Sequence, residues 1–193
     1  QVVQNRLQRM SANARPLLKF AAVAGRQVDL VLLEAVKGDL DVDEWLSECS
    51  SAAVMDVMDE RWRFAHDKLR EGLLDSLDPD ERRVLHRQVA QALESVYADT
   101  KDEYAMIIAD HYEAAGDYTQ ALIWSVRAGK HSDEAFAPAT AIQYYRKALT
   151  LWEHADAVEP ASLLMGRLSV YARLGELLTW QARYDEAVTV FGE

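Results

Sequence analysis

The stretch from Trp62 to Leu77 decides the fold, and it reads Trp-Arg-Phe-Ala-His-Asp-Lys-Leu-Arg-Glu-Gly-Leu-Leu-Asp-Ser-Leu. Its first residues alternate between polar and apolar side chains, as a half-buried strand does. Beyond Asp67 the apolar residues recur at helical spacing, at Leu69, Leu73, Leu74 and Leu77. The stretch therefore predicts a joint at which a small domain passes into a series of stacked helices.

Three short helices are predicted before this joint. The apolar pattern from Asn5 to Val23 indicates the first helix, broken near Ser11 and ended by Gly25, and residues 30–36 indicate the second. Asp41 and Glu44 have the spacing of a capping box, which opens the third.

Residues 53–58 and 61–64 then read as two strands joined by a turn at Asp59 and Glu60. Three helices followed by a hairpin is the element order of a winged helix. We therefore expect a winged-helix domain at residues 1–77, with its β-hairpin near residues 53–65.

Many winged helices bind DNA through the third helix, but the charges here argue against that use. The predicted third helix carries carboxylates and no Lys or Arg, and the whole chain has a formal net charge of −11. Binding to phosphates depends on Lys and Arg side chains. We therefore expect no nucleic-acid partner. The carboxylates are those of Asp41, Asp43, Glu44 and Glu48.

Several other classes of function are disfavoured by what the sequence lacks. It has no apolar run of membrane-spanning length and no signal peptide, so we expect a cytoplasmic protein without a membrane partner. The single cysteine, Cys49, cannot form an internal disulfide or a multi-cysteine metal site. His86, His111, His131 and His154 lack the close spacing of metal ligands, so no metal is expected.

Catalysis by this chain alone is not expected either. It has no Ser-His-Asp arrangement that can be argued from sequence and no Gly-x-x-x-x-Gly-Lys-Ser/Thr loop for phosphates. The start at Gln1 and an apolar end at Phe191 are typical of a piece of a longer protein. We therefore expect a non-enzymatic fragment that holds no cofactor of its own.

The joint also carries a resemblance to a known family. Phe-x-His-Asp-x-Leu-Arg-Glu at residues 64–71, continued by the helix at residues 78–94, resembles the end of the winged-helix domain in STAND ATPases, the signal-transduction ATPases with numerous domains. The closest likeness is to bacterial regulators in which tetratricopeptide repeats follow the ATPase. The resemblance implies signal transduction or transcription regulation, ATP or ADP bound by the parent protein, and an upstream nucleotide-binding domain as partner.

The resemblance also places a role on His66 and Asp67. In the family, the histidine of this pair contacts the phosphates of ADP and holds the ATPase in its resting form. His66 would take that role, with Asp67 setting the turn and the helix start. A helix N-terminus favours the same anion. The alternative is structural: His66 packs at the end of the strand and Asp67 serves as the N-cap of the helix.

Residues 78–100 are predicted to form a linking helix. Asp78 is a favourable N-cap, and Pro79 suits the first turn. We expect this helix to bury Val84, Leu85, Val89, Ala92, Leu93 and Val96. Thr100 and Glu103 form a second capping-box pattern, which predicts a further helix running to Ala115.

Residues 101–193 are predicted to form a tetratricopeptide-like helical solenoid that is truncated at its C-terminus. Residues 116–121, Gly-Asp-Tyr-Thr-Gln-Ala, are echoed 66 positions later by Ala-Arg-Tyr-Asp-Glu-Ala at 182–187, about two repeat lengths. Ala141 follows Ala121 by only 20 residues, so the helix from 118 to 133 should close one unit and open the next. Pro138 should start the next helix, and Glu159-Pro160 another.

The small and large side chains expected to pack the repeats follow from this alignment. They are Ala109, Tyr112, Gly116, Tyr118, Ala121, Ala128, Ala141, Tyr145, Ala148, Leu174, Gly175, Leu178, Tyr184, Ala187 and Phe191.

Stacked helical pairs form a concave groove, so the expected partner of the repeats is a protein or peptide. Val188, Val190 and Phe191 would be left open at the C-terminal end, which favours self-association or further repeats. The sequence leaves two functions open. One is the regulatory fragment of a STAND-type ATPase, and the other is a tetratricopeptide adaptor without any ATPase.

Overall fold

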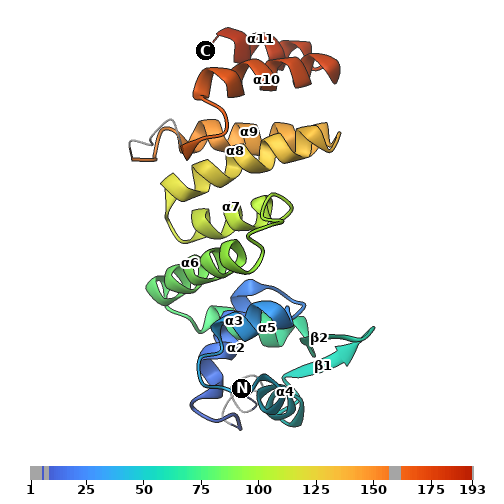
Figure 1. Ribbon diagram of the computed structural model, residues 1–193, viewed down its shortest axis with the longest axis vertical. Helices are drawn as coiled ribbons and strands as arrows, with labels where there is room; N and C mark the ends of the chain where they lie inside the picture. Colours follow the sequence, from blue (N-terminus) through green and yellow to red (C-terminus); the bar gives the residue numbers. More distant parts are fainter. Residues whose placement is uncertain (1–5, 7–8, 157–161, 193) are drawn as a thin grey trace. The chain divides into compact units, whose positions relative to one another are not determined.

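The computed structural model describes residue 6, residues 9–156 and residues 162–192. The described part is mainly helical, with one two-stranded antiparallel hairpin (Figure 1). Its chain divides into two compact units, residues 1–96 and residues 97–193. The helices and strands are α2 (Ala14–Ala24), α3 (Leu30–Val36), α4 (Val42–Ser51), β1 (Met55–Met58), β2 (Arg61–Phe64), α5 (Asp67–Asp75), α6 (Pro79–Val96), α7 (Ala105–Ala114), α8 (Tyr118–Glu134), α9 (Pro138–Leu151), α10 (Arg167–Trp180) and α11 (Tyr184–Gly192).

The first unit begins with the three predicted helices. The carboxylate of Asp41 accepts a hydrogen bond from the Glu44 backbone N–H at 2.9 Å, so the predicted start of α4 is confirmed. Gly25 ends α2 as expected, and its N–H donates to the carbonyl of Ala21. Trp45 of α4 is fully buried and donates its indole N–H to the Ala14 carbonyl at 2.9 Å, which fixes α4 against α2.

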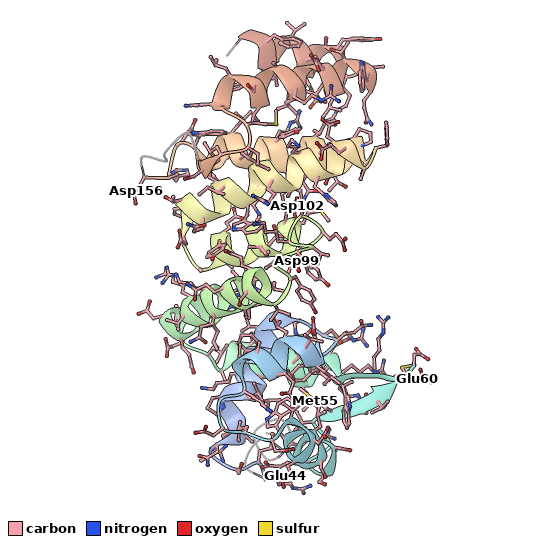
Figure 2. All side chains as sticks on the ribbon, viewed as in Figure 1. Glu44, Met55, Glu60, Asp99, Asp102 and Asp156 are labelled. Atoms are coloured by element: carbon pink, nitrogen blue, oxygen red, sulfur yellow. The ribbon has the colours of Figure 1, made fainter. Side chains whose placement is uncertain are left out.

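The predicted hairpin is confirmed, and its register pairs Met55 with Phe64 and Met58 with Arg61. Asp59 and Glu60 both have positive φ, as the tight two-residue turns of hairpins require. Figure 2 shows Met55 close to the helices of the first unit and Glu60 at the far tip of the hairpin. Only the base of the hairpin is therefore part of the core, because Met55 and Phe64 are both 1% exposed.

A third extended segment, residues 26–28, pairs with β2 on the side away from β1. The Phe64 N–H donates to the Arg26 carbonyl at 3.2 Å, and the Val28 N–H donates to the Trp62 carbonyl at 2.8 Å. β2 is thus the central strand of the small sheet. This pairing was not predicted, because the segment between α2 and α3 is too short to show a strand pattern.

The helix that follows α5 belongs to the first unit in the structure. α6 starts as predicted, with the Asp78 carboxylate accepting from the N–H groups of Asp80 and Glu81. It packs on α2 and α3 through a face that buries Leu85, Val89 and Leu93. The predicted burial of Val84 and Val96 is wrong, since Val84 is exposed and Val96 is only half-buried. α6 ends at Val96, where the two units divide, rather than near residue 100.

The second unit opens with a turn region in place of the helix expected at Thr100. Backbone N–H groups at Thr100, Glu103 and Tyr104 donate to carbonyls three residues earlier, so α7 begins only at Ala105. The rings of Tyr97 and Tyr104 stack with their centroids 3.9 Å apart across this region. The predicted capping box at Thr100 is therefore wrong as a helix start. The start predicted at Glu159-Pro160 lies outside the described residues.

The same turn reverses the chain three times in the second unit. The residue in left-handed conformation is Gly116 between α7 and α8, Phe136 between α8 and α9, and Ala182 between α10 and α11. In each turn the following N–H donates to a carbonyl five residues earlier, the long bond of a Schellman motif. The bonds are Asp117 to Tyr112, Ala137 to Ser132 and Arg183 to Leu178.

α8 is shared by two of these helical hairpins. It packs on both α7 and α9, as the 20-residue spacing in the sequence predicts. α10 and α11 form a separate hairpin, and α10 also packs on α9. The second unit is thus a series of helices in which each packs on the next.

Glycine sets the closest approach within two of the hairpins. A Cβ at Gly129 of α8 would lie 2.6 Å from the Tyr145 ring of α9, and one at Gly175 of α10 would overlap the Phe191 ring of α11. Both glycines and both rings are 46 residues apart in the sequence. The two hairpins therefore use the same contact between a small residue and an aromatic ring.

Ion pairs then join each of α7, α8 and α9 to the second helix along the chain. Their side chains are partly exposed, so solvent screens each pair and its contribution to stability is small. Between them they limit sliding of the helices. The pairs are Lys147 with Asp110 at 2.6 Å, Arg173 with Asp133 at 2.5 Å, and Arg146 with Glu186.

We predict that Gly129→Val lowers the free energy of unfolding by about 1–3 kcal/mol, because the added atoms overlap the Tyr145 ring in a closely packed contact. Urea denaturation measures the change. Gly166→Ser is the matched control, because a side chain at Gly166 meets no atom within 4 Å and serine is a favourable N-cap. Equal midpoints for Gly129→Val and the unsubstituted protein would show that the ring moves aside.

A second prediction concerns the stability of the protein at low pH. Hydrogen bonds from Arg183 and Arg146 lower the pKa of Glu186 to about 2. Its folded pKa is depressed, so its contribution to stability is present above the unfolded value of about 4.3 and is lost as the pH falls towards 2. The difference in unfolding free energy between the unsubstituted protein and Glu186→Gln should be constant above pH 5 and should vanish near pH 2. A difference that is independent of pH would contradict this assignment.

Candidate functional site

The candidate site is the junction between β2 and α5, where His66 lies. Phe64 is buried at the end of β2, and the Ala65 N–H donates to the Val54 carbonyl at 3.0 Å. His66 then follows in extended conformation as the N-cap residue of α5, and its carbonyl accepts from the Leu69 N–H. Both sides of His66 are held by backbone hydrogen bonds, so the position of its backbone is well defined.

The imidazole of His66 is exposed and makes no capping hydrogen bond to the first turn of α5. A histidine packed at the end of a strand would be buried, so the structure contradicts that half of the structural alternative. The exposed ring lies where backbone N–H groups of a helix start have no partner within the helix. This arrangement suits an anion from outside the chain, which would accept hydrogen bonds from these N–H groups.

Asp67 is the first residue of α5 and not its N-cap, so the structure contradicts the other half of the alternative as well. Its carboxylate pairs with the Arg26 guanidinium at 2.9 Å. Arg26 lies in the extended segment that pairs with β2. The ion pair therefore connects the start of α5 to the small sheet, and a carboxylate in the first turn also favours the helix dipole.

Further arginines surround the junction, and each has a partner in the first unit. Arg70 of α5 donates to the Ala22 carbonyl at 2.7 Å, and Arg63 of β2 pairs with Asp56 at 3.1 Å. Arg61 donates to the side-chain oxygen of Gln27. These contacts engage the three arginines, while His66 and Lys68 at the start of α5 remain exposed. The sequence alone did not indicate these arginines as its neighbours.

His66 does not line the largest hollow of the first unit that the structure describes. A hollow of about 1100 Å³ lies elsewhere in the first unit, between α2, the segment after α3 and α6. His66 and Asp67 are not among its lining residues. A nucleotide at His66 would therefore be held chiefly by groups outside this chain, with the imidazole donating to a phosphate oxygen.

Most of the predicted repeat-packing residues lie in the core of the second unit. Tyr118, Tyr184 and Phe191 are exposed. Gly116 forms the left-handed turn described above. The remaining residues are buried between helices, namely Ala109, Tyr112, Ala121, Ala128, Ala141, Tyr145, Ala148, Leu174, Gly175, Leu178 and Ala187.

Other chemistry is not assembled in the part of the chain that the structure describes. No group of three or more His, Cys, Asp or Glu side chains there could hold a metal ion. Cys49 is buried with a free thiol, and burial raises its pKa to about 12, which keeps it protonated and unreactive. Among the described helices, none is long and apolar enough to cross a membrane.

Comparisons with known proteins give one distant relative. No family model matches the chain, and no solved structure matches it. The chain is 28% identical over 189 residues to an uncharacterized protein of Rhizobium meliloti (strain 1021). The match covers 92% of this chain but 18% of the relative, so the chain spans less than a fifth of that protein's length.

Proposed function

We propose that this chain is the regulatory part of a larger STAND-type ATPase signalling protein. In this proposal the first unit is a winged-helix domain that closes over a nucleotide bound upstream. The second unit is the beginning of a tetratricopeptide sensor arm. The observation that carries the proposal is the exposed imidazole of His66 at the start of α5, held in place without a capping role.

Two features of the fold support these roles for the two units. The first is the order of three helices and a hairpin, with the segment at residues 26–28 completing a small sheet around β2. The second is the turn that recurs at residues 116, 136 and 182, together with the repeated contact of glycine with an aromatic ring. Both are consistent with a winged helix followed by stacked repeats.

The proposed mechanism is a two-state switch. In the resting state His66 donates to a phosphate oxygen of ADP in the upstream domain. A charge-assisted hydrogen bond contributes about 1.5–3 kcal/mol, so its loss shifts an equilibrium by roughly ten- to a hundredfold. A partner that binds the repeats would move the first unit, withdraw His66 from the phosphate and allow ADP to leave.

A DNA-reading role for the first unit fits the charges less well. α4, the third helix, carries Asp43 and Glu44 in its first turn and no basic residue in its last turn. Carboxylates on that helix would repel a phosphate backbone. The proposal therefore gives the winged helix a partner within the same protein.

We predict that His66→Ala in the full-length protein speeds ADP release by at least about tenfold, because one charge-assisted bond to the phosphate is lost. Release of a fluorescent ADP analogue from the purified protein measures the rate. His154→Ala is the matched control, since His154 is also exposed but lies in the second unit.

Equal release rates in the unsubstituted protein and in His66→Ala would show that His66 does not sense the nucleotide. If the full-length protein bound no nucleotide at all, the ATPase proposal would fail. A repeat adaptor capped by the first unit would then be the better description.

A further inference from the structure

Phe136 occupies a position that its side chain does not suit. It lies in the turn between α8 and α9 with φ of 56°, and its side chain is 93% exposed. A left-handed conformation costs an L-residue roughly 1–2 kcal/mol, and the equivalent position between α7 and α8 is Gly116. Within the second unit no burial of the ring offsets this cost. A strained, exposed aromatic residue indicates contact with another molecule.

The equivalent turn of the next hairpin is flanked by two more exposed aromatic residues. Trp180 ends α10 and is 73% exposed, while Tyr184 begins α11 and is 61% exposed. The α8–α9 turn and the α10–α11 turn lie at the same side of the second unit in Figure 1. The side chains of Phe136, Trp180 and Tyr184 are called the aromatic edge below.

Hydrogen bonds and a cation–π contact connect the α8–α9 turn to Trp180. The Phe136 N–H donates to the Asp133 carbonyl at 3.0 Å. The Asp133 carboxylate accepts two hydrogen bonds from Arg173, at 2.5 and 2.8 Å, and the Arg173 guanidinium lies 4.8 Å from the Trp180 ring centroid. Arg173 thereby supports one face of Trp180 and leaves the rest of the ring to solvent. Trp180 is thus held in place before any partner arrives, which limits the entropy that its side chain loses on binding.

The charges around the aromatic edge define the partner. Glu134 and Glu176 pair with cations of their own helices, yet 63% and 55% of their side chains remain exposed. Such surface pairs are weak enough to exchange partners. The second unit has fifteen Asp and Glu residues against eight Lys and Arg residues. Trp and Tyr faces attract guanidinium and ammonium groups, as Arg173 already illustrates on Trp180.

We propose that the aromatic edge docks a basic segment of a partner protein, in which Arg or Lys side chains alternate with aliphatic ones. The cations stack on Trp180 and Tyr184 and pair with Glu134 and Glu176, and the aliphatic side chains cover Phe136. Aromatic anchors of this kind dominate binding energy at protein interfaces. The inference deepens the partner-binding half of the proposed function and rests on it.

The test is a titration of the full chain with a fluorescein-labelled peptide of alternating Arg and Leu, followed by fluorescence anisotropy. Phe136→Gly and Trp180→Ser should each weaken binding by about tenfold, the usual loss for an interface anchor. Leu168→Ser is the matched control, because Leu168 is 85% exposed but lies in the first turn of α10, at the end of that helix opposite to Trp180. It should leave the affinity unchanged.

Phe136→Gly also relieves the left-handed strain, so this variant should melt no lower than the unsubstituted protein. A loss of peptide affinity in it therefore reports the missing ring and not unfolding.

Four results would overturn the inference. These are no measurable binding of the Arg-Leu peptide, an affinity of both edge variants equal to that of the unsubstituted protein, a weakening by Leu168→Ser equal to that of the edge variants, and binding of a Glu-Leu peptide equal to that of the Arg-Leu peptide. Dimerisation in sedimentation that Phe136→Gly abolishes would assign the edge to a second copy and also overturn it. The titration contains no nucleotide, so its failure is distinguishable from a failure of the His66 experiment.

Discussion

The second unit depends on how closely two helices can approach where one of them has no side chain. Gly129 and Gly175 leave room for the rings of Tyr145 and Phe191, and any Cβ there would overlap the ring. Close approach is needed because neighbouring helices are joined by turns of only three residues. Tyr145 is fully buried and interiors pack at the density of organic crystals, so its contact with Gly129 fixes the separation and register of α8 and α9.

The rest of the second unit follows from that contact. Once two helices are set, the alanines at the neighbouring crossing points are buried, and the ion pair of Asp133 with Arg173 reaches across to the second helix along. The ion pairs are too exposed to hold the helices together by themselves. They stabilise the observed register of the packed helices relative to registers in which the helices have slid past one another.

Much of this fold could be predicted from local patterns. Residues close in sequence determine three of the predicted features. These are the caps at Asp41 and Asp78, the hairpin turn at Asp59 and Glu60, and the shared helix α8. The features of the fold that were not predicted depend on contacts between residues distant in sequence. The segment at residues 26–28 becomes a strand only because β2 offers it free backbone groups, and the exposure of Val84 depends on which face α6 turns towards α2 and α3. At the candidate site the pattern located His66, but its exposure and the Arg26–Asp67 pair required three-dimensional information.

The helix shared by two hairpins has a consequence for how this unit opens. α8 cannot unfold without exposing both the face of α7 and the face of α9 that pack on it, so we expect these three helices to lose their structure together. α10 and α11 share no helix with the preceding hairpin, so their opening exposes only the face of α9 that packs on α10 and breaks the ion pairs of Arg173 and Glu186. Native-state hydrogen exchange would then divide the unit into a slow block of α7, α8 and α9 and a faster block of α10 and α11. Any signal that passes along the second unit would travel through the first block as one rigid element and would be interrupted, if at all, between α9 and α10.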